Sequence, residues 1–400
     1  MGPTDTSHCP RSQPSVHFFK LILRNALRHK LRTALTVLGI VIAVLAFGLL
    51  QTVVDAWYAG ADKAAPNRLI TRNAISLTFP LPLAYREKIR GVEGVKAVSY
   101  ANWFGGIYQS PKNFFPQFAI DPETYLAVYS EYRVDERELA EFIRDRKGAL
   151  VGRKLADAYG FRIGDTVPLK GTIYPGTWEF TVRGIYEGAD ARTDTAQFFF
   201  HWDYLNETSK KRSRVRVDQV GVFVVEIDAP ERAAAMSQAI DGVFRNSVAE
   251  TLTETERAFQ LSFVAMTGTI VAAIRIVSFV VIFIILAVMA NTMAMTARER
   301  LSEYATLKAL GFGPLFVSAL ILGESIAIAA IGGAIGMVAT FPVAKVVAAK
   351  TGTLFPVFEV SSSTLGLQVA CALGVGLAAA LVPMRRAASV RIVEGLRAVG

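Results

Sequence analysis

Four long windows without a charged residue constrain this chain more than any other feature of its sequence. Each holds 20 to 25 residues, and they cover positions 33–54, 276–297, 325–344 and 360–384. Because a helix rises about 1.5 Å per residue, about 20 apolar residues cross a hydrocarbon layer of about 30 Å. One such window could be a buried helix of a soluble protein, but four are not explained in that way. We therefore predict a membrane protein with four transmembrane helices.

Composition agrees with this class and excludes others. Hydrophobic residues make up 52% of the chain before its 31 glycines are counted, whereas about 45–50% is usual for a soluble domain with glycine included. The two cysteines, Cys9 and Cys371, exclude a disulfide scaffold and a cysteine-based zinc cluster. The first window begins more than thirty residues into the chain and is too long for the apolar part of a signal peptide. We therefore expect a retained helix there.

The distribution of positive charge predicts the orientation of these helices. The connection between the third and fourth windows holds only Lys345 and Lys350. Basic residues cluster instead before the first window, after the second and after the fourth: Lys20, Arg24, Arg28, Lys30, Arg32, Arg298, Arg300, Lys308, Arg385, Arg386, Arg391 and Arg397. Since such residues stay mostly on the cytoplasmic side, we expect both termini and the middle connection in the cytoplasm.

The predicted fold class is a membrane protein with four transmembrane helices and a large α/β (α+β) extracytoplasmic domain inserted between helices 1 and 2. The outer segment is long enough for a folded domain of its own. The expected segments are a cytoplasmic tail with a basic amphipathic helix (1–33), helix 1 (34–54), the extracytoplasmic domain (55–267), helix 2 (268–296), a cytoplasmic coupling helix (297–312), helix 3 (313–343), a short outer loop (344–363), helix 4 (364–384) and a cytoplasmic tail (385–400).

The outer segment alternates strand and helix patterns. Alternating and β-branched stretches predict strands, and amphipathic stretches between them predict helices: strands at 95–103, 165–169, 178–186 and 220–227, and helices at 82–90, 152–159 and 230–244. Such a mixture is typical of α+β or α/β domains, in one or two lobes. Because the chain must return to the membrane after this domain, we expect pieces from both of its ends to pair.

No segment carries the motifs of a familiar enzyme. The nearest match to a phosphate-binding loop, residues 148–154, lacks the spacing and the Ser or Thr that hold phosphates and magnesium. The chain has neither His-Glu-x-x-His nor Gly-x-Ser-x-Gly. His201 has no nucleophile nearby in the sequence, so we expect a surface or packing residue. We predict that the chain alone is not an enzyme and has no catalytic, cofactor-binding or metal-binding residues.

Two kinds of residue run leave alternatives open. The basic run at 210–216 is typical of a solvated loop, with contact to lipid headgroups or an acidic partner as the alternative. The aromatic runs at 114–118 and 198–202 indicate a core or an interface between lobes, because consecutive strand residues face both sides of a sheet. Their alternative is an apolar surface for a hydrophobic cargo or a partner subunit.

Charged and small residues within the predicted helices suggest contacts there. Arg275 can reach the outer surface of the membrane, whereas Glu324 lies near the cytoplasmic end of helix 3. Glu324 is either an interface residue or a functional contact, because intramembrane charge is costly. Gly332 and Gly336 form a Gly-x-x-x-Gly pattern that permits close helix packing, within the chain or between subunits.

Two cytoplasmic segments combine charge with a helical pattern. Before helix 1, apolar and basic residues recur every four positions, which predicts an amphipathic helix on the inner leaflet: Lys20, Leu23, Arg24, Leu27, Arg28 and Leu31. After helix 2, good helix formers continue to a glycine stop, and a charged helix tied to two spans can transmit force. Its key positions are Arg298, Glu299, Arg300, Glu303, Leu307, Lys308 and Gly311.

This second segment carries a family resemblance. Residues 291–311, Asn-Thr-Met-Ala-Met-Thr-Ala-Arg-Glu-Arg-Leu-Ser-Glu-Tyr-Ala-Thr-Leu-Lys-Ala-Leu-Gly, resemble the MacB/FtsX-type ABC transporter permeases. In that family an Arg-Glu-Arg stretch, an acidic residue and a Lys/Arg-Ala-Leu-Gly ending follow the second span. The first-span entry at 25–40, the Gly-Asp segment at 152–167, Glu324 with its glycines and the Pro-x-Arg-Arg-Ala tail at 383–397 are similar as well. The resemblance covers nearly the whole chain.

The resemblance implies a type VII permease, which works by mechanotransmission in the bacterial inner membrane. It implies two permease copies, identical or paralogous, and a separate cytoplasmic ATPase that carries the ATP and magnesium, with no cofactor on this chain. The charged helix after helix 2 would meet that ATPase. Membrane lipid is a further expected partner, and a periplasmic adaptor and an outer-membrane channel are candidates. Nucleic acid is not expected.

Three functions fit these expectations. The first is ATP-driven export or extrusion of hydrophobic or amphipathic cargo, and the second is release of lipoproteins or extraction of lipids. The third is FtsX-like signalling across the membrane to a cell-wall hydrolase. The large outer domain favours the first two, and the few polar residues in the spans disfavour a stand-alone channel or carrier.

Overall fold

The computed structural model describes residues 28–190, 193–212, 216–351 and 357–389. The chain forms two compact units. We call them the helix unit, made of Met1–Val54, Ile270–Val346 and Glu359–Gly400, and the sheet unit, made of Asp55–Thr269 and Val347–Phe358. The predicted fold class is confirmed, because a mixed α/β domain is inserted between the first and second of four long apolar helices.

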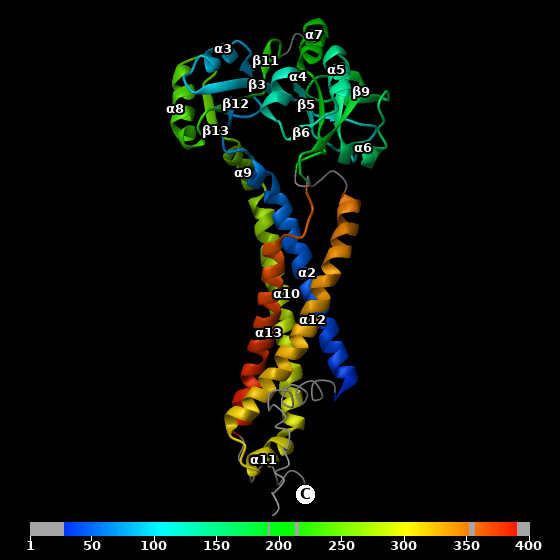
Figure 1. The fold of residues 1–400 in the computed structure, drawn as a ribbon, viewed down its shortest axis with the longest axis vertical. Coiled ribbons are helices and arrows are strands. Elements are labelled where there is room, and N and C mark those ends of the chain that lie inside the picture. Colours follow the sequence, from blue (N-terminus) through cyan, green and yellow to red (C-terminus); the bar gives the residue numbers. More distant parts are fainter. Residues whose placement is uncertain (1–27, 191–192, 213–215, 352–356, 390–400) are drawn as a thin grey trace, which may run out of the picture. The chain divides into compact units, whose positions relative to one another are not determined.

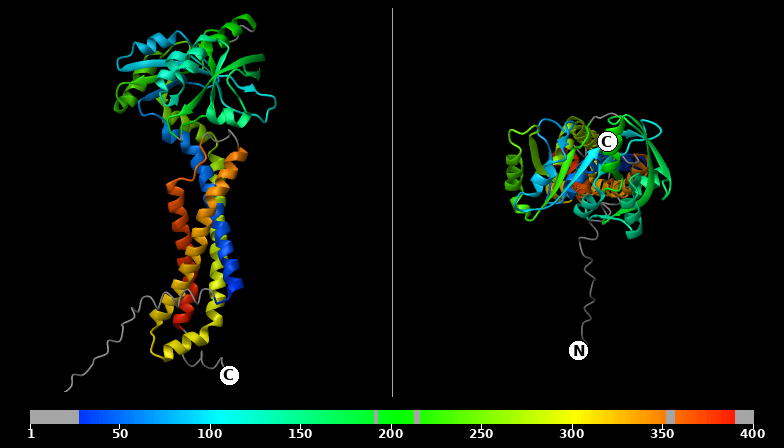
Figure 2. Two further views of the ribbon diagram at one scale, coloured as in Figure 1. Left: turned by 45° about the vertical axis from the view of Figure 1, so that its right-hand side comes forward. Right: turned by 90° about the horizontal axis from the view of Figure 1, so that it is seen from above.

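Each of these four helices is long and apolar enough to cross a membrane. They are α2 (Lys30–Lys63), α10 (Gly268–Glu299), α12 (Pro314–Thr351) and α13 (Ser362–Ser389), and the short α11 (Leu301–Ala309) connects α10 to α12. Within the helix unit they run side by side (Figures 1 and 2). Pro342 lies inside α12 and Pro383 inside α13.

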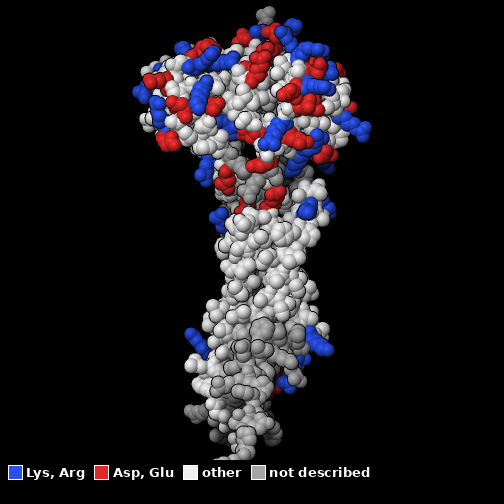
Figure 3. All heavy atoms as spheres, viewed as in Figure 1, with Lys and Arg blue, Asp and Glu red and all other residues white. Residues whose placement is uncertain are grey.

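The surface of the helix unit is suited to lipid. On its visible face, Figure 3 shows a long white band, in which no Lys, Arg, Asp or Glu is seen. The visible face of the sheet unit instead carries many charges of both signs. Large apolar side chains of α10 point outward, among them Phe279, Phe283 and Ile284, which are 56–69% exposed. An apolar surface of this extent is unfavourable in water and favourable in a bilayer.

Glycines let α2 lie close against α12. A Cβ atom on Gly332 would lie 2.8 Å from the side chain of Ile40, and one on Gly336 would lie 2.9 Å from the carbonyl oxygen of Val41. The predicted Gly-x-x-x-Gly pattern therefore makes its close contact within the chain.

A polar contact joins three helices in the interior of the same unit. Gln368 of α13 is fully buried, and its Nε2 donates to the Val44 carbonyl oxygen of α2 and to Thr340 Oγ1 of α12, both at 2.9 Å. A Cβ atom on Gly48 would lie 2.0 Å from that nitrogen. The hydrogen bonds and the close approach therefore both depend on glycine at this position.

An eleven-stranded mixed sheet is the framework of the sheet unit. Its strands are β1 (Arg68–Asn73), β3 (Val95–Trp103), β4 (Gly106–Ile107), β5 (Gln117–Ile120), β6 (Tyr132–Arg133), β7 (Gly148–Gly152), β8 (Thr166–Gly171), β9 (Gly176–Gly188), β10 (Phe198–His201), β12 (Val222–Ile227) and β13 (Thr251–Thr255). The order is β13-β1-β12-β3-β5-β10-β7-β9-β8-β4, and β6 pairs with β9 beside this path. β10 runs parallel to β5 and β7 runs parallel to β9, and the other pairs are antiparallel.

The pairing of the two ends of the domain is confirmed, because β1 lies between β12 and β13. Two predicted boundaries are wrong. The predicted strand at 220–227 is divided into β11 (Gln219–Val220) and β12, since β11 pairs with β2 (Leu81–Pro82) in a separate small sheet. For the same reason the predicted helix at 82–90 begins only at Tyr85.

Helices cover the sheet at several places. α8 packs on β13, α3 and α4 on β3, and α5 on β9, as Figure 1 illustrates. The helices of this unit are α3 (Tyr85–Arg90), α4 (Pro122–Val128), α5 (Glu136–Arg144), α6 (Arg153–Tyr159), α7 (Trp202–Arg212), the 3-10 helix η1 (Pro230–Arg232), α8 (Ala233–Val243) and α9 (Glu256–Met266).

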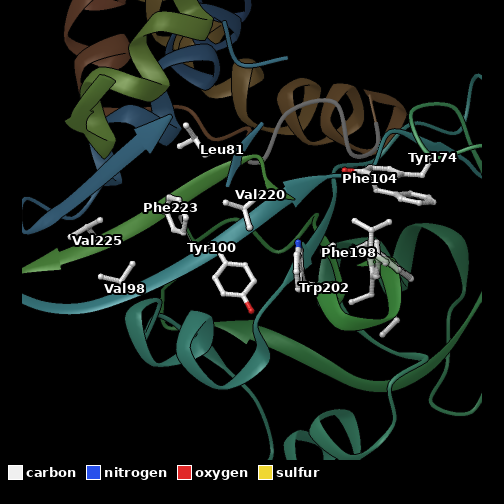
Figure 4. Packing of buried hydrophobic residues seen from close by; sticks show 14 of the residues in the cluster. Leu81, Val98, Tyr100, Phe104, Tyr174, Phe198, Trp202, Val220, Phe223 and Val225 are labelled. Carbon is white, nitrogen blue, oxygen red and sulfur yellow. The ribbon is translucent and has the colours of Figure 1, made fainter. Parts of the chain in front are cut away.

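The aromatic run at 198–202 forms part of the core. Phe198, Phe199 and Phe200 are all fully buried. Phe198 and Phe200 belong to one apolar cluster, part of which is drawn in Figure 4, and Phe199 belongs to a second. Consecutive residues thus serve both faces of β10, as predicted. In the other run, Phe115 belongs to the first cluster and is 1% exposed, whereas Phe114 is 52% exposed. His201 is a buried packing residue, with its Nε2 2.7 Å from the Phe142 carbonyl oxygen.

Candidate functional site

The segment predicted as one coupling helix at 297–312 is two helices. α10 ends at Glu299 and α11 begins at Leu301, with Arg300 between them (φ −106°, ψ 16°). After α11, Gly311 has a φ of +96°, which favours glycine. The sequence hides the break between the helices because the residues on both sides of it are good helix formers.

The side chain of Arg300 lies inside the helix unit. The residue is 6% exposed, its Nε donates to Glu303 Oε2 and its Nη1 donates to Glu324 Oε2, each at 2.9 Å. The ring of Tyr304 lies beside the guanidinium, with its centroid 5.6 Å from Cζ. Arg300 therefore ties the connection between α10 and α11 to α12. The direct contact with a partner that we predicted for Arg300 stays a prediction.

Ion pairs also join the start of α2 to this connection. Arg32 donates to both carboxylate oxygens of Glu299, at 2.7 and 2.8 Å, and Arg28 pairs with Glu303. On the other side, Lys308 Nζ donates to the carbonyl oxygen of Ala387 in α13, at 3.0 Å. We call this set the α11 junction; it consists of Arg28, Arg32, Glu299, Arg300, Glu303, Lys308 and Glu324.

Electrostatics favour the ionised form of Glu303 in the junction. Burial alone would raise the pKa of Glu303, but hydrogen bonds from Arg300 and Arg28 outweigh it and hold that pKa below its usual range. At neutral pH the carboxyl group of Glu303 is therefore a carboxylate that faces two guanidinium groups.

The outward surface of this region is partly apolar. Arg298 and Gly311 are exposed and Leu307 is half-buried against the apolar cluster of the helix unit. The following residues Leu310 and Phe312 are 72% and 42% exposed. Their exposure was not predicted, because sequence patterns singled out Leu307 as the apolar position.

Part of the predicted inner-leaflet helix can also be placed. Arg28 belongs to the junction, and Leu31, in the first turn of α2, is 76% exposed. The remaining predicted positions lie outside the described residues: Lys20, Leu23, Arg24 and Leu27.

The sheet unit holds a second candidate site. A cavity of about 420 Å³ lies between the last turns of α2 and α9, and Gln260 and Thr267 supply its polar side chains. Apolar residues form most of the lining: Ala56, Trp57, Ala61, Phe263, Val264 and Met266. Such a lining suits a hydrocarbon group better than a charged one. Among the described residues, no group of three His, Cys, Asp or Glu could hold a metal ion.

Comparison with known proteins identifies the family. Residues 33–243 match the MacB-like periplasmic core domain, and residues 275–392 match the FtsX-like permease C-terminal domain. The first match alone covers more than half of the chain. This chain belongs to the MacB/FtsX-type ABC transporter permeases. It is therefore a multi-pass membrane protein with an extracytoplasmic domain, and membership implies a partner ATPase.

One relative matches this permease along nearly its full length. An uncharacterised ABC transporter permease of Methanocaldococcus jannaschii, MJ1507, is 24% identical over 393 residues, which cover 94% of this chain and 96% of that protein. Among solved structures, the extracellular domain of the noncanonical ABC-type transporter YknZ from Gram-positive bacteria is 13% identical, with a TM-score of 0.36 over 47% of this chain and 99% of that one. A domain of a permease protein from Porphyromonas gingivalis is 12% identical, with a TM-score of 0.33 over 48% and 93%.

Sequence reasoning found some residues of the permease's α11 junction and missed how they pair. Glu324 was predicted to be a costly charge within a span, and Arg300 and Glu303 were both predicted as key positions after helix 2. The contact between Arg300 and Glu324 was missed, as was that between Arg32 and Glu299. The position of Glu324 within a span could have indicated its pairing with Arg300, since a carboxylate within a span requires a nearby cation.

Proposed function

We propose that this permease couples ATP hydrolysis by a separate cytoplasmic ATPase to movement of its extracytoplasmic domain. The observation that supports this best is that α11 is linked to every long helix of the helix unit. It follows α10, pairs through Glu303 with Arg28 beside α2, and donates from Lys308 to the carbonyl group of Ala387 in α13. Arg300 adds the link to α12. A displacement of α11 would therefore act on the whole bundle.

The ATPase contact would use the outward surface of α11 and its C-terminal turn. Leu310 and Phe312 supply an apolar anchor there, and the exposed Arg298 supplies charge. ATP and magnesium bind the ATPase, and closure of two ATPase subunits would shift α11 as a rigid element. Two permease copies, identical or paralogous, would respond together.

The chain itself carries this movement outward along two routes. α10 is preceded by α9 and β13, and α2 leads into β1. Because β13 and β1 are neighbours in one sheet, both routes enter the domain at the same place. We infer from this arrangement that the domain moves as the outer part of a two-helix lever.

The proposed cargo is hydrophobic or amphipathic. The apolar cavity of about 420 Å³ between α2 and α9 supports this choice, because Trp57, Phe263 and Met266 line it and few polar groups do. The same cavity also favours the second candidate, release of lipoproteins or extraction of lipids, since a hydrocarbon chain is compatible with it. A periplasmic adaptor and an outer-membrane channel remain proposed partners.

We further propose that both termini and α11 are cytoplasmic, and that in a bacterium the permease lies in the inner membrane. The basic residues around α2, α11 and the end of α13 support this orientation.

Association with the ATPase tests the proposal. Leu310→Asp should abolish co-purification of the ATPase and leave membrane insertion intact, because an apolar anchor is lost outside the bilayer. Val248→Asp is the matched control, since Val248 is fully exposed in the sheet unit. Equal co-purification by both variants and the wild type, with unchanged ATP turnover, would contradict the proposed contact.

A further inference from the structure

A buried arginine joins three parts of the sheet unit that are far apart in the sequence. Arg68 begins β1, just after α2. Its Nε donates to Glu256 Oε2 at 2.8 Å, and its Nη1 and Nη2 donate to the two carboxylate oxygens of Glu131 at 3.0 and 2.6 Å. Nη1 also donates to the carbonyl oxygen of Val128 at 3.2 Å. One guanidinium group therefore bonds two carboxylates and one backbone carbonyl.

Glu256 begins α9 and completes the network. Its Oε2 accepts the backbone N–H of Ala65 at 3.2 Å, and its Oε1 accepts the hydroxyl of Tyr129 at 3.0 Å. The ring centroid of Tyr129 lies 4.0 Å from the Cζ atom of Arg68. The start of α9 thus contacts both the segment that follows α2 and the segment that follows α4.

Burial makes this geometry demanding. The side chains of Arg68 and Glu256 are each 5% exposed, and that of Glu131 is 32% exposed. Burial would lower the pKa of Arg68, but the two carboxylates outweigh this effect and raise it. Charges removed from water are tolerated only when each is paired and hydrogen-bonded. The three groups are therefore held in one arrangement.

The network connects distant parts of the sheet. Arg68 lies in β1, between β12 and β13 at one end of the strand order, whereas Glu131 precedes β6, which pairs with β9 toward the other end. In Figure 1, α8 and β13 lie at one end of the sheet unit, β9 and α6 lie at the other, and α4 and β6 lie between them. Through the sheet, β1 reaches β9 only by way of several intervening strands, whereas the guanidinium of Arg68 bonds the turn between α4 and β6 directly.

We propose that Arg68 is a positioning residue that holds the end of α2, the start of α9 and the turn between α4 and β6 as one rigid joint. Movement of α2 and α9 is then passed to the turn and to β9. Without the joint, the segments between α2 and β1 and between β13 and α9 could bend, and the movement would not reach the turn. The source of the movement rests on the proposed function, whereas the joint itself is a property of the sheet unit.

A second ion pair in the same strand provides a matched control. Arg72 Nε donates to Glu254 Oε1 at 2.9 Å, and these side chains are 16% and 20% exposed. Arg72 also lies in β1, and its partner lies in β13, directly before α9. The hydrogen bonds of Arg72 go to Glu254 and Asn73 and not to the turn between α4 and β6. Replacement of Arg72 therefore removes an ion pair from the strand without breaking the joint.

Hydrogen exchange of the full-length permease in lipid nanodiscs tests the joint. In Arg68→Met, backbone amides at 129–132 and 256–258 should exchange at least about tenfold faster, because both contacts of the guanidinium are lost. Glu131→Gln keeps the bond to Glu256 and should loosen 129–132 alone, which guards against a general folding defect. Arg72→Met should leave both segments unchanged. Equal protection of the amides at 129–132 from exchange in Arg68→Met and the wild type would overturn the proposal that Arg68 forms this joint.

A distance measurement tests the transmission. Spin labels on Ala140 of α5 and Ala258 of α9, both exposed, should keep one narrow distance throughout the ATP cycle of the permease–ATPase complex. In Arg68→Met that distance should broaden and shift with nucleotide, and in Arg72→Met it should not. A nucleotide-dependent distance in the wild type would overturn the proposal. If neither label moves relative to the bilayer in the wild type, the proposed function is contradicted. The hydrogen-exchange comparison of the variants then still tests whether Arg68 forms the joint.

Discussion

Arg300 and Glu324 form a buried ion pair between the α10–α11 connection and α12, with 2.9 Å between Nη1 and Oε2 and side chains that are 7% and 5% exposed. The pair holds Arg300, the residue between the end of α10 and the start of α11, against α12. The same guanidinium also bonds Glu303 on α11. One residue therefore bonds both α12 and the element that we propose to contact the ATPase.

Loss of the carboxylate of Glu324 should destabilise the permease strongly. Glu324→Gln removes one of the two carboxylates that bond the buried guanidinium of Arg300 and leaves only Glu303, and breaking a buried pair costs up to about 3–5 kcal/mol. Thermal unfolding in detergent should show a large drop in Tm. Arg298→Gln, an exposed charge two residues from Arg300, should change stability by less than about 0.5 kcal/mol. Similar unfolding of both variants would show that the pair contributes little.

Gly48 should not tolerate a methyl group. A Cβ atom there would lie 2.0 Å from Gln368 Nε2, so Gly48→Ala should break the contact between α2, α12 and α13 at a cost of about 1–3 kcal/mol. Gly374→Ala in α13 is the matched control, since no atom lies within 4 Å of its added Cβ. We expect unfolding of the control to match the wild type. A stable Gly48→Ala variant with intact helix contacts would contradict this packing.

Stability should depend on the protonation of His201. Burial lowers the pKa of this side chain from 6.5, so the unfolded chain binds a proton at a higher pH than the folded one. The contribution of neutral His201 is present above about pH 6.5 and is lost as pH falls toward the lower folded pKa. The wild type should therefore lose more stability between pH 7 and pH 5 than His201→Gln. Parallel pH profiles would exclude this contribution.

Cysteine labelling can determine the orientation. In a background without native cysteines, Asp157→Cys in the sheet unit and Thr306→Cys on α11 both place a thiol at an exposed position. A membrane-impermeant maleimide should label position 157 in intact cells and position 306 only after the membrane is opened. The opposite pattern would reverse the proposed topology.

The accuracy of the sequence predictions follows from the range of each interaction. The four membrane helices were predictable because their signal lies in consecutive residues. The burial of Phe198, Phe199 and Phe200 was also predictable from three consecutive aromatic residues, because consecutive strand residues face both sides of a sheet. By contrast, Arg68 and Glu256 are 188 positions apart, and no local pattern selects that pair from the other charges of the domain. Arg300 lies among good helix formers, so no local pattern marks the break there, and its partner Glu324 is 24 positions away.

Transmission of the work of the ATPase through α11 to the extracytoplasmic domain can be measured in the assembled complex. Spin labels at Asp157 of two permease copies report the distance between the domains by pulsed EPR, without nucleotide and trapped with ATP and vanadate. We expect a nucleotide-dependent shift of that distance in the wild type, and its loss in Glu303→Lys, which reverses a charge that faces Arg28 and Arg300. A full shift in Glu303→Lys, with ATP turnover equal to that of the wild type, would show that α11 does not transmit this work.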